Sequence, residues 1–214
     1  TTLQFGEVSA GSPGCQEGSG EMSVKPLLNA FRDYLSLRDE PVIREWLDGF
    51  DWNLSERNLV PRTYSACGFL TAAQEHAGRA EAALLSRLIE CSGQVQWQQM
   101  YTAEDFGQSF LDNYTHMELI GPEGHFMSDE IAAGLVIYGP GLDYPDHWHI
   151  AEEIYIPLTS DGLWSADGAP LAARKAGSFI FHESNMRHAI RAGGAPLVAL
   201  WVWCNGDLHQ KADY

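Results

Sequence analysis

The sequence has little positive charge for its size. Lys and Arg number 13 against 29 Asp and Glu, which gives a formal net charge of −16. Binding to the phosphates of nucleic acid requires clusters of Lys and Arg, so we expect no nucleic-acid partner. An acidic surface is also repelled by anionic membranes. A cationic or zwitterionic small molecule is compatible with this charge.

Cysteines and long apolar runs are also scarce. The four cysteines are widely spaced and form no CxxC pair: Cys15, Cys67, Cys91 and Cys204. This pattern does not predict a disulfide framework and fits a reducing compartment. No run approaches the 18 apolar residues of a membrane span, and the Gly- and Ser-rich start has no apolar signal-peptide core. We therefore expect a cytoplasmic protein that is not embedded in a membrane.

The first half of the chain has a helical pattern. Residues 1–22 are predicted to be a flexible lead-in, and residues 23–105 an N-terminal helical region. Apolar residues recur every three or four positions over residues 23–50, where Pro41 is typical of a helix start. An Ala-rich stretch predicts one helix over residues 71–91.

The second half has the pattern of a small β-barrel. Short apolar or alternating segments, separated by Gly and Pro, predict strands at 117–120, 133–138, 153–158, 162–165, 178–181, 188–191 and 197–203. Many short strands at close spacing predict a sandwich or a closed barrel. The expected fold is α+β, with the helical region packed on a C-terminal antiparallel barrel at residues 106–214.

Four potential metal ligands occur in this second half. In the segment GLDYPDHWHIAEEIY, His149 follows His147 by two residues and Glu153 follows His149 by four. Residues two apart on a strand share a face. With a bend before Glu153, these side chains can therefore point into one cavity. His188 comes from a separate, later strand and is expected to complete the site from across the barrel.

Imidazoles and a carboxylate are ligands for divalent transition metals. Taken singly, any of these histidines is better explained as a surface or core residue. Their combined spacing favours a site for one divalent ion, with Zn, Mn, Fe, Ni and Co all compatible. Three or four protein ligands leave one or two positions for water or substrate.

The two segments resemble the paired motifs of the cupin superfamily. The first motif matches Gly141, His147, His149 and Glu153, and the second matches Gly177, Glu183, Asn185 and His188. The usual Pro and Gly of the second motif are replaced by Glu183 and Asn185. Asn can adopt the left-handed conformation that Gly supplies. The resemblance implies the double-stranded β-helix barrel of cupins.

A narrower resemblance concerns two tyrosines near the first motif. Tyr155 lies two residues after Glu153 and Tyr144 five before His149. This arrangement resembles the cupin-type dimethylsulfoniopropionate (DMSP) lyases of bacteria, particularly their DddL branch. It implies β-elimination of DMSP, a small zwitterion, to dimethyl sulfide and acrylate. It also implies Tyr155 as the catalytic base, Tyr144 as a second functional tyrosine and the four residues above as metal ligands. Barrels of this type often pair, so a homodimer is compatible.

A sulfonium group needs a surface that attracts a cation without forming an ion pair. Aromatic faces do so by cation–π attraction, and Tyr138, Phe179 and Trp201 are the candidate substrate contacts. His182 lacks a partner at ligand spacing. Because it lies six residues before His188 it could support the metal ligands, but a surface position is the better interpretation. Glu152 is expected on the outer face of its strand, without a catalytic role.

Two other functions stay open at this point. Three histidines and one glutamate also suit a cupin dioxygenase acting on a small molecule, because the fold alone does not fix the chemistry. A non-catalytic cupin that binds a ligand would carry a structural metal or none. The two tyrosines favour the lyase.

Overall fold

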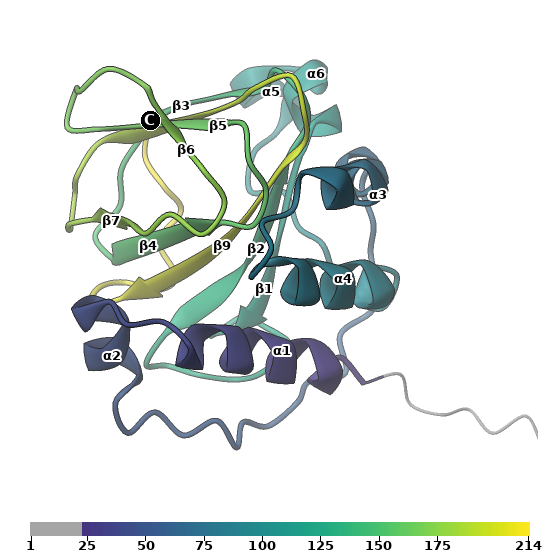
Figure 1. Cartoon of the computed structure of the whole chain (residues 1–214), viewed down its shortest axis with the longest axis vertical. Coiled ribbons are helices and arrows are strands. Elements are labelled where there is room, and N and C mark those ends of the chain that lie inside the picture. Colours follow the sequence, from purple (N-terminus) through teal and green to yellow (C-terminus); the bar gives the residue numbers. More distant parts are fainter. Residues whose placement is uncertain (1–22) are drawn as a thin grey trace, which may run out of the picture.

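The computed structural model describes residues 23–214, so the expected lead-in at 1–22 lies outside the described residues. The two longest helices cover the outer face of one of two β-sheets (Figure 1). The helical elements are α1 (Lys25–Ser36), α2 (Pro41–Leu47), η1 (Ser65–Phe69), α3 (Leu70–Ala73), η2 (Gln74–His76), α4 (Ala82–Cys91), α5 (Ala103–Phe106) and α6 (Gln108–Asp112). Within the described residues, no helix is long and apolar enough to cross a membrane.

Helix α2 begins at Pro41, as predicted, but the single helix expected over residues 71–91 is wrong. The chain leaves helical geometry at Ala77, whose backbone is extended (φ −61°, ψ 139°). The Gly78 N–H then donates to the Leu158 carbonyl at 2.9 Å. A Cβ on Gly78 would lie 1.9 Å from a Glu81 carboxylate oxygen. Docking of this segment against the barrel therefore overrides its helical propensity.

The strands form two antiparallel sheets. They are β1 (Tyr114–Ile120), β2 (Ala132–Tyr138), β3 (Asp143–His147), β4 (Glu152–Pro157), β5 (Gly162–Ala166), β6 (Ala172–Arg174), β7 (Ile180–His182), β8 (His188–Ala192) and β9 (Leu197–Cys204). The larger sheet has the order β1-β2-β9-β4-β7 and the smaller β3-β8-β5-β6. All seven predicted strands are found, and β3 and β6 are additional.

Two hydrophobic cores lie on opposite faces of the larger sheet. Strand β9 shows the division, because Val198, Leu200 and Val202 belong to the core shared with the helices. The alternating residues Trp201 and Trp203 belong to the core between the sheets. Burial on both faces accounts for the unbroken apolar sequence of this strand. The inner core is rich in aromatic side chains, and it surrounds the candidate site.

The boundary expected at residue 105 falls inside α5 (Ala103–Phe106). The core beneath the helices also takes side chains from both sides of that boundary, such as Phe31 and Leu200. We therefore propose that the helical region and the barrel are two layers of one folding unit.

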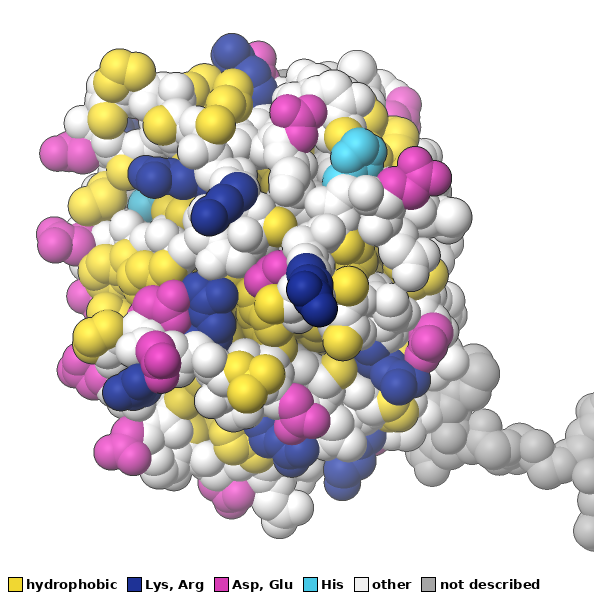
Figure 2. Space-filling view, viewed as in Figure 1, with side chains coloured by type: hydrophobic (Ala, Val, Ile, Leu, Met, Phe, Trp, Pro, Cys, Tyr) yellow, Lys and Arg dark blue, Asp and Glu magenta, His cyan; other side chains and the backbone are white. Residues whose placement is uncertain are grey.

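Acidic and basic side chains are interspersed on the face of the molecule shown in Figure 2. Lys and Arg form no continuous patch on that face. Several of the arginines pair with neighbouring carboxylates, as Arg38 does with Glu40.

Candidate metal centre

The structure brings the four predicted ligands together. One donor atom from each of His147, His149, Glu153 and His188 lies within 4.8 Å of the others, and all four side chains are buried. Glu153 Oε2 lies 3.1 Å from His149 Nε2 and 3.0 Å from His188 Nε2. The four residues that the spacing argument selected therefore converge in one cluster.

The two sheets contribute different ligands. His147 on β3 and His188 on β8 are direct cross-strand partners, with ring centroids 4.0 Å apart. His188 is thus a neighbour of His147 on the same sheet. The predicted position of His188, across the barrel from His147, is wrong. Glu153 is the ligand that comes from the opposite sheet, on β4. The chain crosses between the sheets after His147, and His149 lies in that crossing.

A bulge in β3 determines which side chains reach the centre. Tyr144 pairs with Ile190 and His147 with His188, so β3 has one residue more than β8 over this interval. In a regular strand, residues three apart point to opposite faces. The bulge, which contains Pro145, brings both Tyr144 and His147 to the inner side. Their ring centroids lie 4.6 Å apart.

Each of the three histidines is held by a backbone carbonyl. The Nδ1–O pairs are His147 with Pro145 (2.9 Å), His149 with Ala151 (2.8 Å) and His188 with Met186 (2.8 Å). A carbonyl oxygen accepts only, so each Nδ1 carries the hydrogen and Nε2 is the ring nitrogen left to face the cluster. Metal-binding histidines in proteins are oriented in this way. The donor set therefore fits a divalent metal ion.

The charges in the cluster also suit a cation. Burial would raise the pKa of Glu153, but the adjacent His149, His182 and His188 hold it well below its usual value. Burial, with a smaller effect of His188, lowers the pKa of His147 well below its usual value. Glu153 is therefore an anion and His147 a neutral imidazole, and both are the forms that bind metals.

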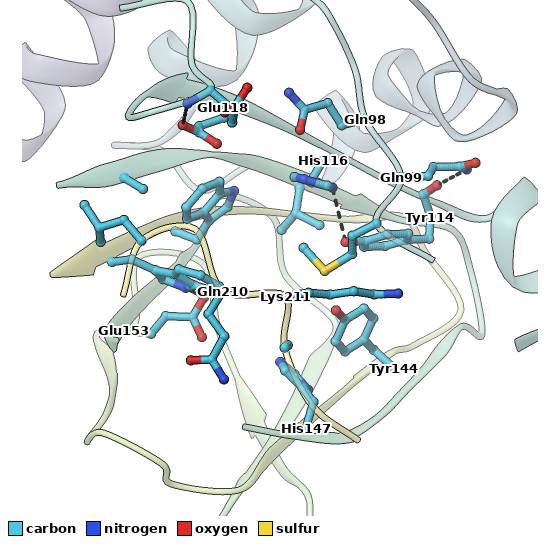
Figure 3. Close-up of a pocket in the computed structure, with 18 of the residues that line it drawn as sticks. Gln98, Gln99, Tyr114, His116, Glu118, Tyr144, His147, Glu153, Gln210 and Lys211 are labelled. Carbon is cyan, nitrogen blue, oxygen red and sulfur yellow. Dashed lines mark hydrogen bonds between the residues drawn. The ribbon is translucent and has the colours of Figure 1, made fainter. Parts of the chain in front are cut away.

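A cavity of about 340 Å³ adjoins the cluster (Figure 3). His147 and Glu153 form part of its wall, together with four of the predicted functional aromatics: Tyr138, Tyr144, Tyr155 and Trp201. C-terminal residues 208–212 also line it. Backbone hydrogen bonds between Asp213 and Trp148 fasten this segment beside the cluster.

Phe179 does not line the cavity, so its prediction as a substrate contact is wrong. It stacks near Phe181, with centroids 6.5 Å apart, and packs against the core on the helix side of the larger sheet. Alternation explains this position, because Phe179 and Phe181 share one face while Ile180 and His182 face inward.

The two candidate catalytic tyrosines lie on opposite sheets. Tyr144 is buried on β3, and its hydroxyl is 2.7 Å from that of Tyr101. Tyr155 is on β4, on the same face as Glu153, with its ring centroid 6.4 Å from that of His188. Burial, followed by the charge of Glu153, raises the pKa of Tyr155 well above its usual value.

His182 is a site residue for which the sequence favours a surface position over a supporting role beside the ligands. The surface position is wrong, because only 1% of His182 is exposed. It lies on β7 directly opposite Glu153 of β4. The inward position follows from alternation along β7, but its closeness to Glu153 depends on a strand pairing that the sequence does not indicate. His116 on β1, at another wall of the cavity, was missed for the same reason.

Glu118 provides a test of the electrostatics of the cavity. Burial raises its pKa to about 7, with a smaller contribution from Glu123, while the backbone of Glu123 and the Arg57 charge act the other way. Folding raises the pKa of Glu118, so the folded protein holds the Glu118 proton more tightly than the unfolded chain does. The resulting contribution to the free energy of unfolding is fully present below the unfolded pKa and disappears as the pH rises through 7. Between pH 5 and pH 8, the protein should lose roughly 2 kcal/mol of unfolding free energy from this group.

The measurement is denaturant unfolding at both pH values. Glu118→Gln has no ionisable group, so its stability should fall less over this interval than that of the unsubstituted protein. Equal pH dependence of the two proteins would contradict the raised pKa.

Comparison with known proteins agrees with the geometry. Residues 42–199 match the sequence profile of the DMSP lyase family. The chain is 37% identical over 156 residues to the DMSP lyase DddQ of Ruegeria pomeroyi, which covers 73% of this chain and 77% of that protein. It is 28% identical over 122 residues to a putative DMSP lyase DddL of Cereibacter sphaeroides, covering 56% and 50% of the two chains.

The fold agrees as well. The crystal structure of DddQ from Ruegeria pomeroyi superposes with a TM-score of 0.79 at 28% identity, covering 88% of this chain and 95% of that one. The predicted α+β fold, a helical region on an antiparallel cupin barrel, is therefore confirmed. With a family profile that spans most of its length and a relative above one third identity, the chain belongs to the DMSP lyase family of carbon–sulfur lyases.

Proposed function

We propose that this protein is a metal-dependent lyase that cleaves DMSP by β-elimination to dimethyl sulfide and acrylate. One observation carries the proposal: a buried cluster of three histidines and a glutamate opens onto a cavity walled by tyrosine and tryptophan. Membership of the family supplies the substrate, because the relatives are named for it.

The cluster would hold one divalent transition metal, with Zn, Mn, Fe, Ni or Co as candidates. The four residues are those predicted: His147, His149, Glu153 and His188. Such an ion, when bound, acts as a Lewis acid for the substrate carboxylate and favours the ionised form of a nearby phenol. The carbonyl bonds to Nδ1 would leave Nε2 of each histidine available to bind the ion.

Tyr155 is the proposed general base. The reaction removes a proton from the carbon next to the carboxylate, and the electron pair forms the new C=C bond. The C–S bond breaks and its electrons stay on sulfur, which leaves as neutral dimethyl sulfide. Tyr155 takes the proton on its phenolate oxygen, and no general acid is required. Tyr144, with Tyr101 2.7 Å from its hydroxyl, is proposed to orient the substrate from the opposite sheet.

The sulfonium end is proposed to lie against aromatic faces. Trp201 and Tyr138 line the cavity, and their rings can attract the cation by cation–π interaction. Phe179 has no place in this proposal, because it packs on the other face of the sheet. A homodimer and a cytoplasmic location stay predictions from the sequence.

The direct test is incubation of metal-loaded protein with DMSP, with headspace measurement of dimethyl sulfide and parallel measurement of acrylate. The two products should form in equal amounts, because one C–S bond yields both. Elimination is redox-neutral, so the rate should be the same without oxygen.

Two outcomes would favour the other interpretations. An activity that disappears under anaerobic conditions would indicate a dioxygenase. Binding of sulfonium or betaine ligands without turnover would indicate a non-catalytic cupin module.

A further inference from the structure

His182 is buried next to the metal centre without a hydrogen-bond partner. Neither ring nitrogen is paired with any other group in the described part of the chain, residues 23–214. The three predicted histidine ligands differ, since each has Nδ1 bonded to a carbonyl. Leaving a buried polar group unpaired costs roughly 1–3 kcal/mol. A buried imidazole that carries this cost in the folded protein needs an explanation.

His182 lies next to two of the predicted ligands, Glu153 and His188. Strand pairing sets it opposite Glu153, and its Nδ1 lies 3.8 Å from Glu153 Oε2. Its ring stacks on that of His188, with centroids 3.9 Å apart and planes inclined by 19°. His182 therefore contacts both the carboxylate ligand and one imidazole ligand.

Glu153 already has one oriented donor on its other side. The buried indole N–H of Trp203 donates to Oε1 at 2.7 Å, and the same indole contacts the His149 ring, with centroids 4.2 Å apart and planes inclined by 32°. The second oxygen, Oε2, faces the ligand nitrogens His149 Nε2 and His188 Nε2. Those two nitrogens would bind the ion, so His182 is the neighbouring side chain left to donate to this oxygen. His182 Nδ1 is near that oxygen, and a movement of about 1 Å gives a normal hydrogen-bond length.

We propose that His182 is a positioning residue of the metal centre, which donates from Nδ1 to Glu153 and fixes the ring plane of His188 by stacking. The inference rests on the metal centre of the proposed function. A direct ligand role fits less well. Among residues 23–214, the donors that converge within 4.8 Å come from four other residues, and no carbonyl fixes the tautomer of His182.

Two substitutions separate the donor from the ring. His182→Phe keeps the flat ring and removes both nitrogens, whereas His182→Asn places an N–H near the position of Nδ1. Zn²⁺ titration of chelator-treated protein should show an affinity about 10- to 100-fold weaker for His182→Phe. His182→Asn should recover most of this loss.

His182→Phe should weaken Zn²⁺ binding without lowering the thermal stability of the metal-free protein. Because His182→Phe removes an unpaired buried group, its thermal midpoint without metal should be equal to or higher than that of the unsubstituted protein. A residue that only packs the core would lower this midpoint when replaced, and that result would overturn the proposal.

The matched control is His116→Phe. His116 is a buried histidine of the same barrel, on β1, packed near Tyr114 and Trp201. Its replacement should leave Zn²⁺ affinity unchanged. An equal loss of affinity in both variants would mean that any buried histidine of this barrel affects the metal, and would overturn the specific role of His182.

The Co²⁺ absorption spectrum distinguishes positioning from ligation. The visible bands of the Co²⁺-loaded protein should keep their pattern in His182→Phe, since the ligand set is unchanged, and a new pattern would show that His182 is itself a ligand. If the unsubstituted protein binds neither ion, the proposed metal centre fails. If it binds Zn²⁺ and His182→Phe binds it equally well, only the positioning role fails.

Discussion

Alanine in place of Glu153 is expected to abolish both the bound metal and the lyase activity. Glu153 is the one anionic member of the cluster, and it joins the two sheets because the other ligands belong to β3, β8 and the crossing after β3. Without it, the three imidazoles would face a divalent cation with no compensating negative charge. His149→Ala should have the same effect, since it removes the imidazole bonded to the carboxylate at 3.1 Å.

Glu152→Ala is the matched control for this experiment. Glu152 is the preceding residue on β4, and its carboxylate accepts from the Asn205 side chain at the surface. Metal analysis of the purified proteins should give about one ion per chain for Glu152→Ala and close to none for Glu153→Ala and His149→Ala. Full occupancy in both of the latter would contradict the ligand assignment.

The barrel could be predicted well from sequence because its signals are local. The apolar run of β9 and the turns rich in Gly and Pro gave each predicted strand within a few residues of its observed position. The helix over residues 71–91 failed for a non-local reason. Its interruption comes from a hydrogen bond between Gly78 and Leu158, which belongs to the barrel. Propensity within a segment contains no information about such docking.

The residues of the candidate site also differ in whether local sequence signals predict their positions. His147, His149 and Glu153 are close in sequence, and strand alternation with one bend before Glu153 is enough to bring them together. Their convergence could therefore be predicted. His182 depends on the pairing of β7 with β4, and Tyr144 reaches the centre through a bulge in β3. Both are properties of strand register, which the sequence of one strand does not specify.

The substitution Tyr155→Phe is expected to reduce turnover by roughly 10²–10⁴-fold, the usual contribution of a positioned general base. Only the hydroxyl is lost, and the ring still fills its place in the core between the sheets, where 6% of Tyr155 is exposed. The fold and the metal content should therefore be preserved. The measurements are kcat with DMSP, metal analysis and thermal unfolding. A small loss of turnover with a large loss of stability would mean that Tyr155 only packs the core.

Tyr144→Phe is the comparison that assigns the roles of the two tyrosines. Its hydroxyl lies 2.7 Å from that of Tyr101 and its ring meets that of His147 edge to face, on the sheet opposite Tyr155. If Tyr144 orients the substrate, its loss should raise KM more than it lowers kcat. Exchange of the α-proton of DMSP with deuterated solvent should persist in Tyr144→Phe and stop in Tyr155→Phe. The reverse pattern would make Tyr144 the base and Tyr155 the orienting residue.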